Sequence, residues 1–201
     1  MTSQNEAPVS KAAIEHLFTQ ARTHKFFSDK PVPETLLRDL YEIARLAPTA
    51  SNTCPMRLVF VVSDEEKAKL SATLMPGNVD KVASAPVVAI IAYDMKFYEA
   101  LKTLAPHIEY PSKHASMGEA QLEEFALRNS SIQAGYLILA ARALGLDCGP
   151  MSGFRKPELD KAFFDGTSLR TNFIMSLGYG SGEQMKDRGA RLSFDECCKV
   201  I

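Results

Sequence analysis

Residues 47–55, with the sequence APTASNTCP, are the most informative segment for the fold, because they join a segment with helical periodicity to an apolar segment typical of a strand. Before them, apolar side chains recur at helical spacing up to Leu46; after them, residues 57–62 read RLVFVV. The loop itself holds only small or polar residues and two prolines. Such a loop can lie against a flat polar ligand and bind it through backbone N–H groups and hydroxyls. The alternative is a plain helix-to-strand connection.

The pattern outward from this loop predicts one α+β domain over residues 1–201, with a central mixed β-sheet flanked by helices. Met75-Pro76-Gly77-Asn78 is expected to break a helix, residues 149–154 to form a glycine-rich turn, and residues 102–118 to form a long loop. The stretch 132–144 is apolar nearly all round, which predicts burial in the domain or in a subunit interface. The expected helices span 10–21, 34–46, 64–74, 119–144 and 157–164, and the expected strands span 57–62, 86–93 and 172–179.

Charge and hydropathy exclude several classes of protein. The chain carries 23 Lys plus Arg against 24 Asp plus Glu, a net charge of −1, which argues against nucleic-acid binding. It has no run of the roughly 18 apolar residues that a membrane helix needs. The N-terminal sequence MTSQNEAPVSK lacks an apolar signal core. We therefore expect a cytoplasmic protein with no nucleic-acid or membrane partner.

Cysteine and histidine spacing predicts neither a disulfide framework nor a metal site. The four cysteines are Cys54, Cys148, Cys197 and Cys198. They form no C-x-x-C pair, which indicates a reduced protein. His107 and His114 have no thiol or carboxylate pattern around them, so both are expected to be surface loop residues. The phosphate-loop and serine-hydrolase motifs are absent. A Cys54 nucleophile stays open as an alternative.

Two basic clusters stand near opposite ends of the chain, at residues 22–25 (RTHK) and at Arg188 and Arg191. A phosphate needs several converging donors, and arginine offers a forked pair. The alternative for residues 22–25 is a solvated helix end whose cations suit the helix dipole. Residues 178–182 (GYGSG) follow the last predicted strand without a helix after them. They are therefore interpreted as a turn, and any nicotinamide nucleotide would bind without a Rossmann domain.

Taken in order, these segments resemble the FMN-dependent nitroreductase family over nearly the whole chain. Residues 22–25 with Lys30-Pro31-Val32 are similar to its basic opening, and residues 47–55 to its aPS-ss-N-x-Q-P loop. Asn78-x-x-Lys81 is similar to a flavin-contacting pair, and residues 149–154 (GPMSGF) to a P-[IM]-x-G-F loop. Arg188-x-x-Arg191-Leu resembles the basic residues near the C-terminus with which members of that family bind the phosphate. The chain departs from the family at Cys54, where glutamine is usual, at Met56, where an aromatic is common, and at His24.

A closer resemblance is to the malonic semialdehyde reductase branch of that family. It rests on residues 22–24 (RTH), 125–134 (FALRNSSIQA), 149–154 and 191–194 (RLSF). The resemblance implies a nitroreductase-like homodimer with FMN at the subunit interface, each FMN touching both chains. It also implies a ping-pong reaction: NADH or NADPH delivers hydride to flavin N5, and a small-molecule electron acceptor then takes it. Malonic semialdehyde, reduced to 3-hydroxypropionate, is the implied acceptor.

Three other functions stay open: a broad reductase of nitroaromatics or quinones, a non-enzymatic flavin carrier, and a thiol redox protein using Cys197 and Cys198. The residues do not decide between NADH and NADPH. They offer no obligatory catalytic acid or base, so water or a loop residue (His107, Tyr110 or His114) would protonate the product.

The resemblance assigns cofactor-binding roles along the chain. It implies that cations bind the phosphate, that the 47–55 loop lines the flavin, that one amide–lysine pair approaches the pyrimidine edge, and that the 149–154 segment covers the ring. The residues implied at the phosphate are Arg22, Lys25, Arg188 and Arg191, with Thr23 and His24 at the phosphate or the ribityl chain. The residues implied along the flavin are Thr49, Ala50, Ser51 and Asn52. Asn78 and Lys81 are implied at the pyrimidine edge, and Pro150, Met151, Ser152 and Gly153 over the ring.

Overall fold

A four-stranded sheet forms the centre of the molecule in the computed structural model, which describes residues 7–108 and 113–201. Its strands follow the order β1 (Met56–Val61), β2 (Val87–Asp94), β4 (Leu169–Gly178) and β3 (Asp147–Met151). Every neighbouring pair is antiparallel. The α+β prediction is confirmed, but the predicted mixed sheet is wrong. An apolar run such as β2 indicates burial on both faces, and burial does not determine strand direction.

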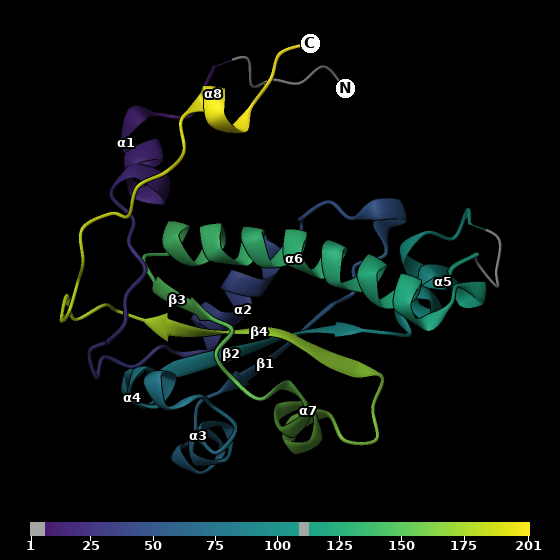
Figure 1. Ribbon diagram of the computed structural model, residues 1–201, viewed down its shortest axis with the longest axis horizontal. Helices are drawn as coiled ribbons and strands as arrows, with labels where there is room; N and C mark the ends of the chain where they lie inside the picture. Colours follow the sequence, from purple (N-terminus) through teal and green to yellow (C-terminus); the bar gives the residue numbers. More distant parts are fainter. Residues whose placement is uncertain (1–6, 109–112) are drawn as a thin grey trace.

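Helices cover both faces of this sheet (Figure 1). The long helix α6 (Glu119–Ala143) crosses one face together with α2 (Glu34–Ala44), whereas α3 (Asp64–Ser71), α4 (Pro76–Ser84) and α7 (Lys156–Phe164) lie on the other. Strand β2 alternates between the two cores: Val87, Ala89 and Ile91 belong to the α6 side, and Val88 and Ile90 to the opposite side. This period of two is the reason that a continuous apolar strand fits here.

The predicted helix break is confirmed, whereas a predicted turn is not. α3 ends at Ser71, before residues 75–78, and α4 begins at Pro76 because proline is well accommodated in the first turn of a helix. The expected turn at 149–154 contains most of β3, where Pro150 is tolerated because β3 is an edge strand. The first predicted helix is a short α1 (Lys11–Ile14) continued by the π-helical segment η1 (Glu15–Thr19).

The predicted long loop is partly ordered into short helices. It holds α5 (Leu101–Leu104) and η4 (Lys113–Ser116), after the preceding η3 (Phe97–Ala100). His114, expected at the surface, is buried, with its ring 5.5 Å from that of Phe97 and 4.9 Å from that of Phe125. This prediction was wrong because the neighbouring aromatic residues form a small core of their own. Tyr110 lies outside the described residues.

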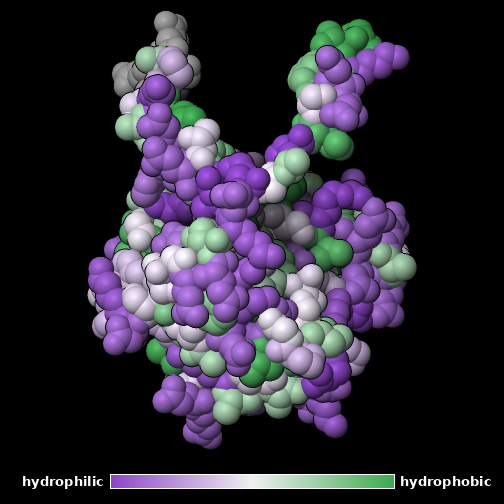
Figure 2. Space-filling view, turned by 60° about the vertical axis from the view of Figure 1, so that its left-hand side comes forward, coloured by the Kyte–Doolittle hydropathy of each residue, from purple (hydrophilic) through white to green (hydrophobic). Residues whose placement is uncertain are grey.

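Apolar surface is exposed along α6 and on two arms of this chain. Leu137 and Ala141 of α6 are buried, but Ile132 and Tyr136 keep 42% and 43% of their surface exposed. The N-terminal and C-terminal segments project from the body (Figure 2), and the C-terminal arm carries the short helix α8 (Phe194–Cys197). Its exposed apolar side chains are Leu192, Phe194, Val200 and Ile201. In the described parts of the chain, no helix combines the length and apolarity needed to cross a bilayer.

Candidate functional site

The two basic clusters, 166 positions apart at Arg22 and Arg188, meet in space. Arg188 donates from Nη2 to the carbonyls of Phe18, Thr19 and Ala21 at 2.9, 2.9 and 2.7 Å. Arg22 donates to carbonyls of the same turn, including that of Ala21 at 3.0 Å. Both guanidinium groups are therefore fixed at the end of η1. They line a cavity of about 250 Å³, called the basic cavity below, together with Thr23, Lys25, Arg142, Lys186 and Arg191.

The basic cavity has a strong excess of positive charge. Among its described lining residues, Asp187 is the single carboxylate. The pKa of Arg188 is lowered from its ordinary value, first by desolvation and then by the nearby charges of Arg22, Arg191 and Arg142. Cations held close together in this way favour an anion with several acceptor oxygens.

Arg142 is the functional candidate that the sequence analysis missed. It extends from the last turn of α6, donates from Nη1 to the Leu17 carbonyl at 2.8 Å, and lines the basic cavity. Its Nε is buried and has no hydrogen-bond partner in the described residues. In the sequence, a single arginine at the end of a long helix has the ordinary explanation of complementing the helix dipole, so no local signal identifies it.

Strand β3 connects the basic cavity to the other predicted segments. Thr23 forms an isolated parallel bridge with Cys148, and Asn78 donates from Nδ2 to the Gly153 carbonyl at 3.0 Å. Lys81 in turn donates to Asn78 Oδ1 at 2.9 Å. A Cβ atom at Gly153 would meet the Asn78 amide, so a larger residue there would displace that side chain. The predicted Asn78–Lys81 pair thus lies beside the predicted Gly153.

The exposed side of β3 is open and mostly neutral. Pro150, Met151 and Ser152 line a shallow cavity of about 350 Å³ together with Asn172 and Phe173 of β4. A flat ring could lie on this surface, because the proline ring, the β3 backbone and the short serine side chain do not project far from it.

His24 turns away from the basic cavity. Its Nε2 lies 3.4 Å from Asp147 Oδ1, and its ring packs against Gly180, whose N–H donates to Asp147 at 2.8 Å. It lines a neighbouring cavity of about 260 Å³ that shares Arg22 and Arg142 with the basic cavity. The side chain of His24 therefore contacts the ends of β3 and β4, and its carbonyl oxygen lies against Gly149 of β3.

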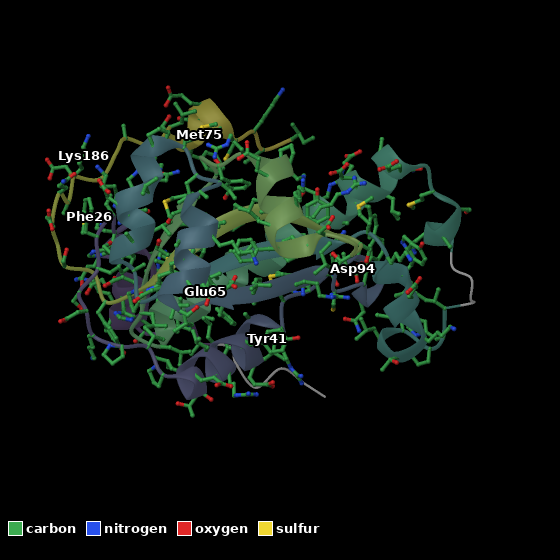
Figure 3. The ribbon with its side chains drawn as sticks, turned by 90° about the horizontal axis from the view of Figure 1, so that it is seen from below. Phe26, Tyr41, Glu65, Met75, Asp94 and Lys186 are labelled. Carbon is green, nitrogen blue, oxygen red and sulfur yellow. The ribbon has the colours of Figure 1, made fainter. Side chains whose placement is uncertain are left out.

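Residues 49–52 lie at the opposite end of the sheet. The loop leads into Met56, which pairs with Tyr93, whereas residues 22–25 lie beside Cys148, in the row of Leu177 and Val87. From Val87 to Tyr93 the strand rises about 20 Å at about 3.3 Å per residue. Figure 3 shows the same separation, with Phe26 and Lys186 at one end and Asp94 at the other. One chain therefore does not bring residues 49–52 to the basic cavity.

The surroundings of residues 49–52 form a separate cavity of about 380 Å³. Asn52 and Cys54 line it with Gln133 of α6, Leu104 of α5 and Arg57 of β1. The larger cavity of about 890 Å³ between α2 and β1 contains none of the predicted site residues. It is a groove along the free edge of β1, away from the clustered cations. No cluster of three potential His, Cys, Asp or Glu metal ligands occurs in residues 7–108 and 113–201.

This chain is similar to known proteins over most of its length. The model of the nitroreductase family matches residues 18–179. A protein of Stutzerimonas stutzeri (strain A1501), named "Putative NADH dehydrogenase/NAD(P)H nitroreductase", is 54% identical over 192 residues, which cover 96% of this chain and 97% of that protein.

Solved structures share the fold. A nitroreductase family protein from Streptococcus pneumoniae has a TM-score of 0.80 at 25% identity, over 92% of this chain and 98% of that one. A structure from Exiguobacterium sibiricum, described as a nitroreductase in complex with FMN, has a TM-score of 0.82 at 21% identity, over 96% of this chain and 99% of that one. The match of the family model and the 54% identity show that this chain belongs to the nitroreductase family.

Proposed function

We propose that this chain is an FMN-dependent NAD(P)H oxidoreductase that works as a homodimer. The observation that carries the proposal is the basic cavity, in which Arg22, Arg142, Arg188 and Arg191 converge beside the glycine-containing strand β3. The FMN complex of the Exiguobacterium sibiricum protein and the name of the Stutzerimonas stutzeri relative support the same cofactor and hydride donor for this chain.

The described residues fit the phosphate and ring of FMN. The buried, unpartnered Nε of Arg142 and the scarcity of carboxylates in the basic cavity suit a phosphate dianion. Thr23 and Lys25 supply further donors in the lining of this cavity. The low surface of Pro150 to Gly153 suits a flat ring, and the Asn78–Lys81 pair stands beside it. For His24, we propose contact through the backbone only, because its ring is directed toward Asp147.

Residues 49–52 enter this proposal from the second subunit. They lie about 20 Å of strand away from the basic cavity of their own chain, so they can line the flavin only across an interface. The exposed Ile132 and Tyr136 of α6 and the apolar C-terminal arm supply surface for that interface. In the homodimer, each FMN site would thus combine the basic cavity of one chain with residues 49–52 of the other.

When bound, FMN would supply the chemistry of hydride transfer between reduced nicotinamide and a second substrate. The protein's own contribution is placement and electrostatics. Lys81, held by Asn78 Oδ1, would stabilise negative charge at the pyrimidine edge, and Asn78 is itself oriented by the Gly153 carbonyl. Asp147, the carboxylate of β3, is paired with His24 and with the Gly180 N–H, and His114 is buried among aromatic rings. We propose water as the proton source.

For the acceptor, we propose malonic semialdehyde, reduced to 3-hydroxypropionate. The support is the resemblance of residues 125–134, 149–154 and 191–194 to that branch of the family. The second candidate is a nitroaromatic or quinone, favoured by the nitroreductase name of the relative that is 54% identical.

A spectral experiment tests the cofactor. The purified protein, or its apoprotein after addition of FMN, should show flavin absorbance that is bleached by NADH or NADPH. Protein that stays colourless and does not bind added FMN would refute the proposal. Turnover of the semialdehyde compared with a nitrofuran then separates the two acceptors, because an oxo-acid rate at background rules out the first.

A further inference from the structure

We propose that Asn129 and Gln133 are positioning residues that hold residues 49–56 in the shape that receives FMN from the partner subunit. The inference rests on the proposed function and extends it to two α6 residues outside the implied cofactor-binding set. Throughout this subsection, residues 49–56 are called the flavin loop.

Two buried amides of α6 bind the two ends of the flavin loop. Asn129 accepts from the Ala50 N–H at 2.8 Å through Oδ1 and donates from Nδ2 to the Phe125 carbonyl at 2.9 Å. Gln133 accepts from the Met56 N–H at 2.9 Å through Oε1. The two residues are 3% and 4% exposed, and their spacing of four places them on one face of the helix.

Between these two anchors the backbone adopts conformations that need external support. Ser51, Asn52 and Cys54 have φ values of 53°, 52° and 41°, in the left-handed region that non-glycine residues rarely occupy. Such conformations persist only where the surroundings over-determine them, and they gather at ligand-binding segments. Within the loop, the Cys54 N–H donates to Thr49 Oγ1 at 3.1 Å, and Asn52 Nδ2 donates to the Leu104 carbonyl of α5 at 2.7 Å. Neither bond holds the backbone N–H of Ala50 or of Met56. Those two positions are fixed by the amides of α6.

The chemistry of the two side chains distinguishes positioning from packing. A helix face against a sheet is normally apolar, and burying an amide there is unfavourable unless its hydrogen bonds are made. Here the acceptors are directed at backbone N–H groups of the flavin loop, which no helix or strand partner satisfies. Ser130, between them, is equally buried but donates to the Ala92 carbonyl of the sheet at 3.3 Å. It provides a matched control on the same helix.

The test uses full-length apoprotein and two readouts that do not depend on turnover. One is the Kd for FMN from quenching of flavin fluorescence; the other is hydrogen–deuterium exchange of the flavin loop. Gln133→Met removes the acceptor at similar volume, whereas Gln133→Glu keeps it. Asn129→Ala removes both bonds of that amide, whereas Asn129→Asp keeps the acceptor for the Ala50 N–H and loses only the donor to the Phe125 carbonyl. Ser130→Ala is the control.

Gln133→Met and Asn129→Ala should each raise the Kd for FMN about tenfold, as expected for one lost hydrogen bond plus a freed loop. They should also accelerate exchange in the flavin loop. Gln133→Glu and Ser130→Ala should leave both readouts close to wild type. A general folding failure of the Met or Ala variant would be recognised by faster exchange throughout the chain, whereas a freed flavin loop would exchange faster on its own.

Wild-type Kd and exchange in Gln133→Met and Asn129→Ala would overturn the inference. So would a loss of FMN affinity in Ser130→Ala equal to theirs, because the effect would then be one of core stability. If the wild-type protein itself binds no FMN, the proposed function fails and the inference falls with it, an outcome distinct from normal binding by the variants.

Discussion

Gly149→Ala tests the close approach between β3 and residues 22–25, on which the basic cavity depends. A Cβ atom at position 149 would lie 2.6 Å from the His24 carbonyl oxygen, closer than real Cβ atoms come to backbone atoms. Since that oxygen is backbone and Gly149 is paired with Ser176 in the sheet, one of the two segments has to move. Overpacking of this kind costs about 1–3 kcal/mol. For a chain of this size, each kcal/mol lowers Tm by about 2–4 °C.

The assay is thermal unfolding of the apoprotein, followed by a titration with FMN. We expect the Tm to fall by about 2–12 °C and the affinity for FMN to fall with it, because the displaced segment carries Arg22 and Lys25. Gly77→Ala is the control: nothing lies within 4 Å of a Cβ there, and Gly77 lies within α4. Alanine should be neutral or stabilising at that position. An unchanged Tm in Gly149→Ala would refute the reasoning about this contact.

Three further predictions concern other parts of the molecule. Arg191→Gln should weaken FMN binding about tenfold or more through loss of a charge-assisted donor, with the apoprotein Tm unchanged; equal loss of both would contradict a role in binding. Burial lowers the pKa of His114, so its contribution to stability is complete above the unfolded value of about 6.5 and is lost as the pH falls through the folded pKa. The Tm should accordingly drop on acidification, and His114→Leu should flatten that component of the profile. Tyr93→Phe removes the buried hydroxyl that donates to Glu123 at 2.6 Å and accepts from Lys156 at 2.8 Å. The free energy of unfolding should fall by about 1–3 kcal/mol, which would appear as a lower urea midpoint at constant m. A wild-type midpoint would show that these hydrogen bonds add nothing to stability.

Periodicity predicted most helices and strands because their burial follows simple repeats. Strand β2 and helix α6 appear in the sequence as apolar runs and are found where expected. Rules for single residues failed where proline is compatible with two kinds of structure. Pro76 breaks one helix but begins the next, and Pro150 indicates a turn but also suits an edge strand. Strand direction depends on chain connections, which composition does not reveal.

The candidate site was only partly predictable for a different reason. Arg22 and Arg188 could be grouped from the resemblance, and the structure brings them together. Arg142 carried no signal, because its role depends on where the end of α6 lies. His24 was placed in the site by its position in a motif, but its ring pairs with Asp147. Asn129 and Gln133 look in the sequence like ordinary polar residues on an amphipathic helix, and only their bonds to the flavin loop distinguish them.

The placement of the basic cavity and residues 49–52 at opposite ends of the sheet has a genetic consequence for the proposed dimer. A copy damaged at Arg191 still offers an intact loop, and a copy damaged at Asn52 still offers intact cations. Neither mutant homodimer would have an intact FMN site. A mixed assembly of the two would carry one pocket with both lesions and one with none. The purified mixed dimer should therefore regain about half of the wild-type turnover, and random pairing after equal co-expression about a quarter.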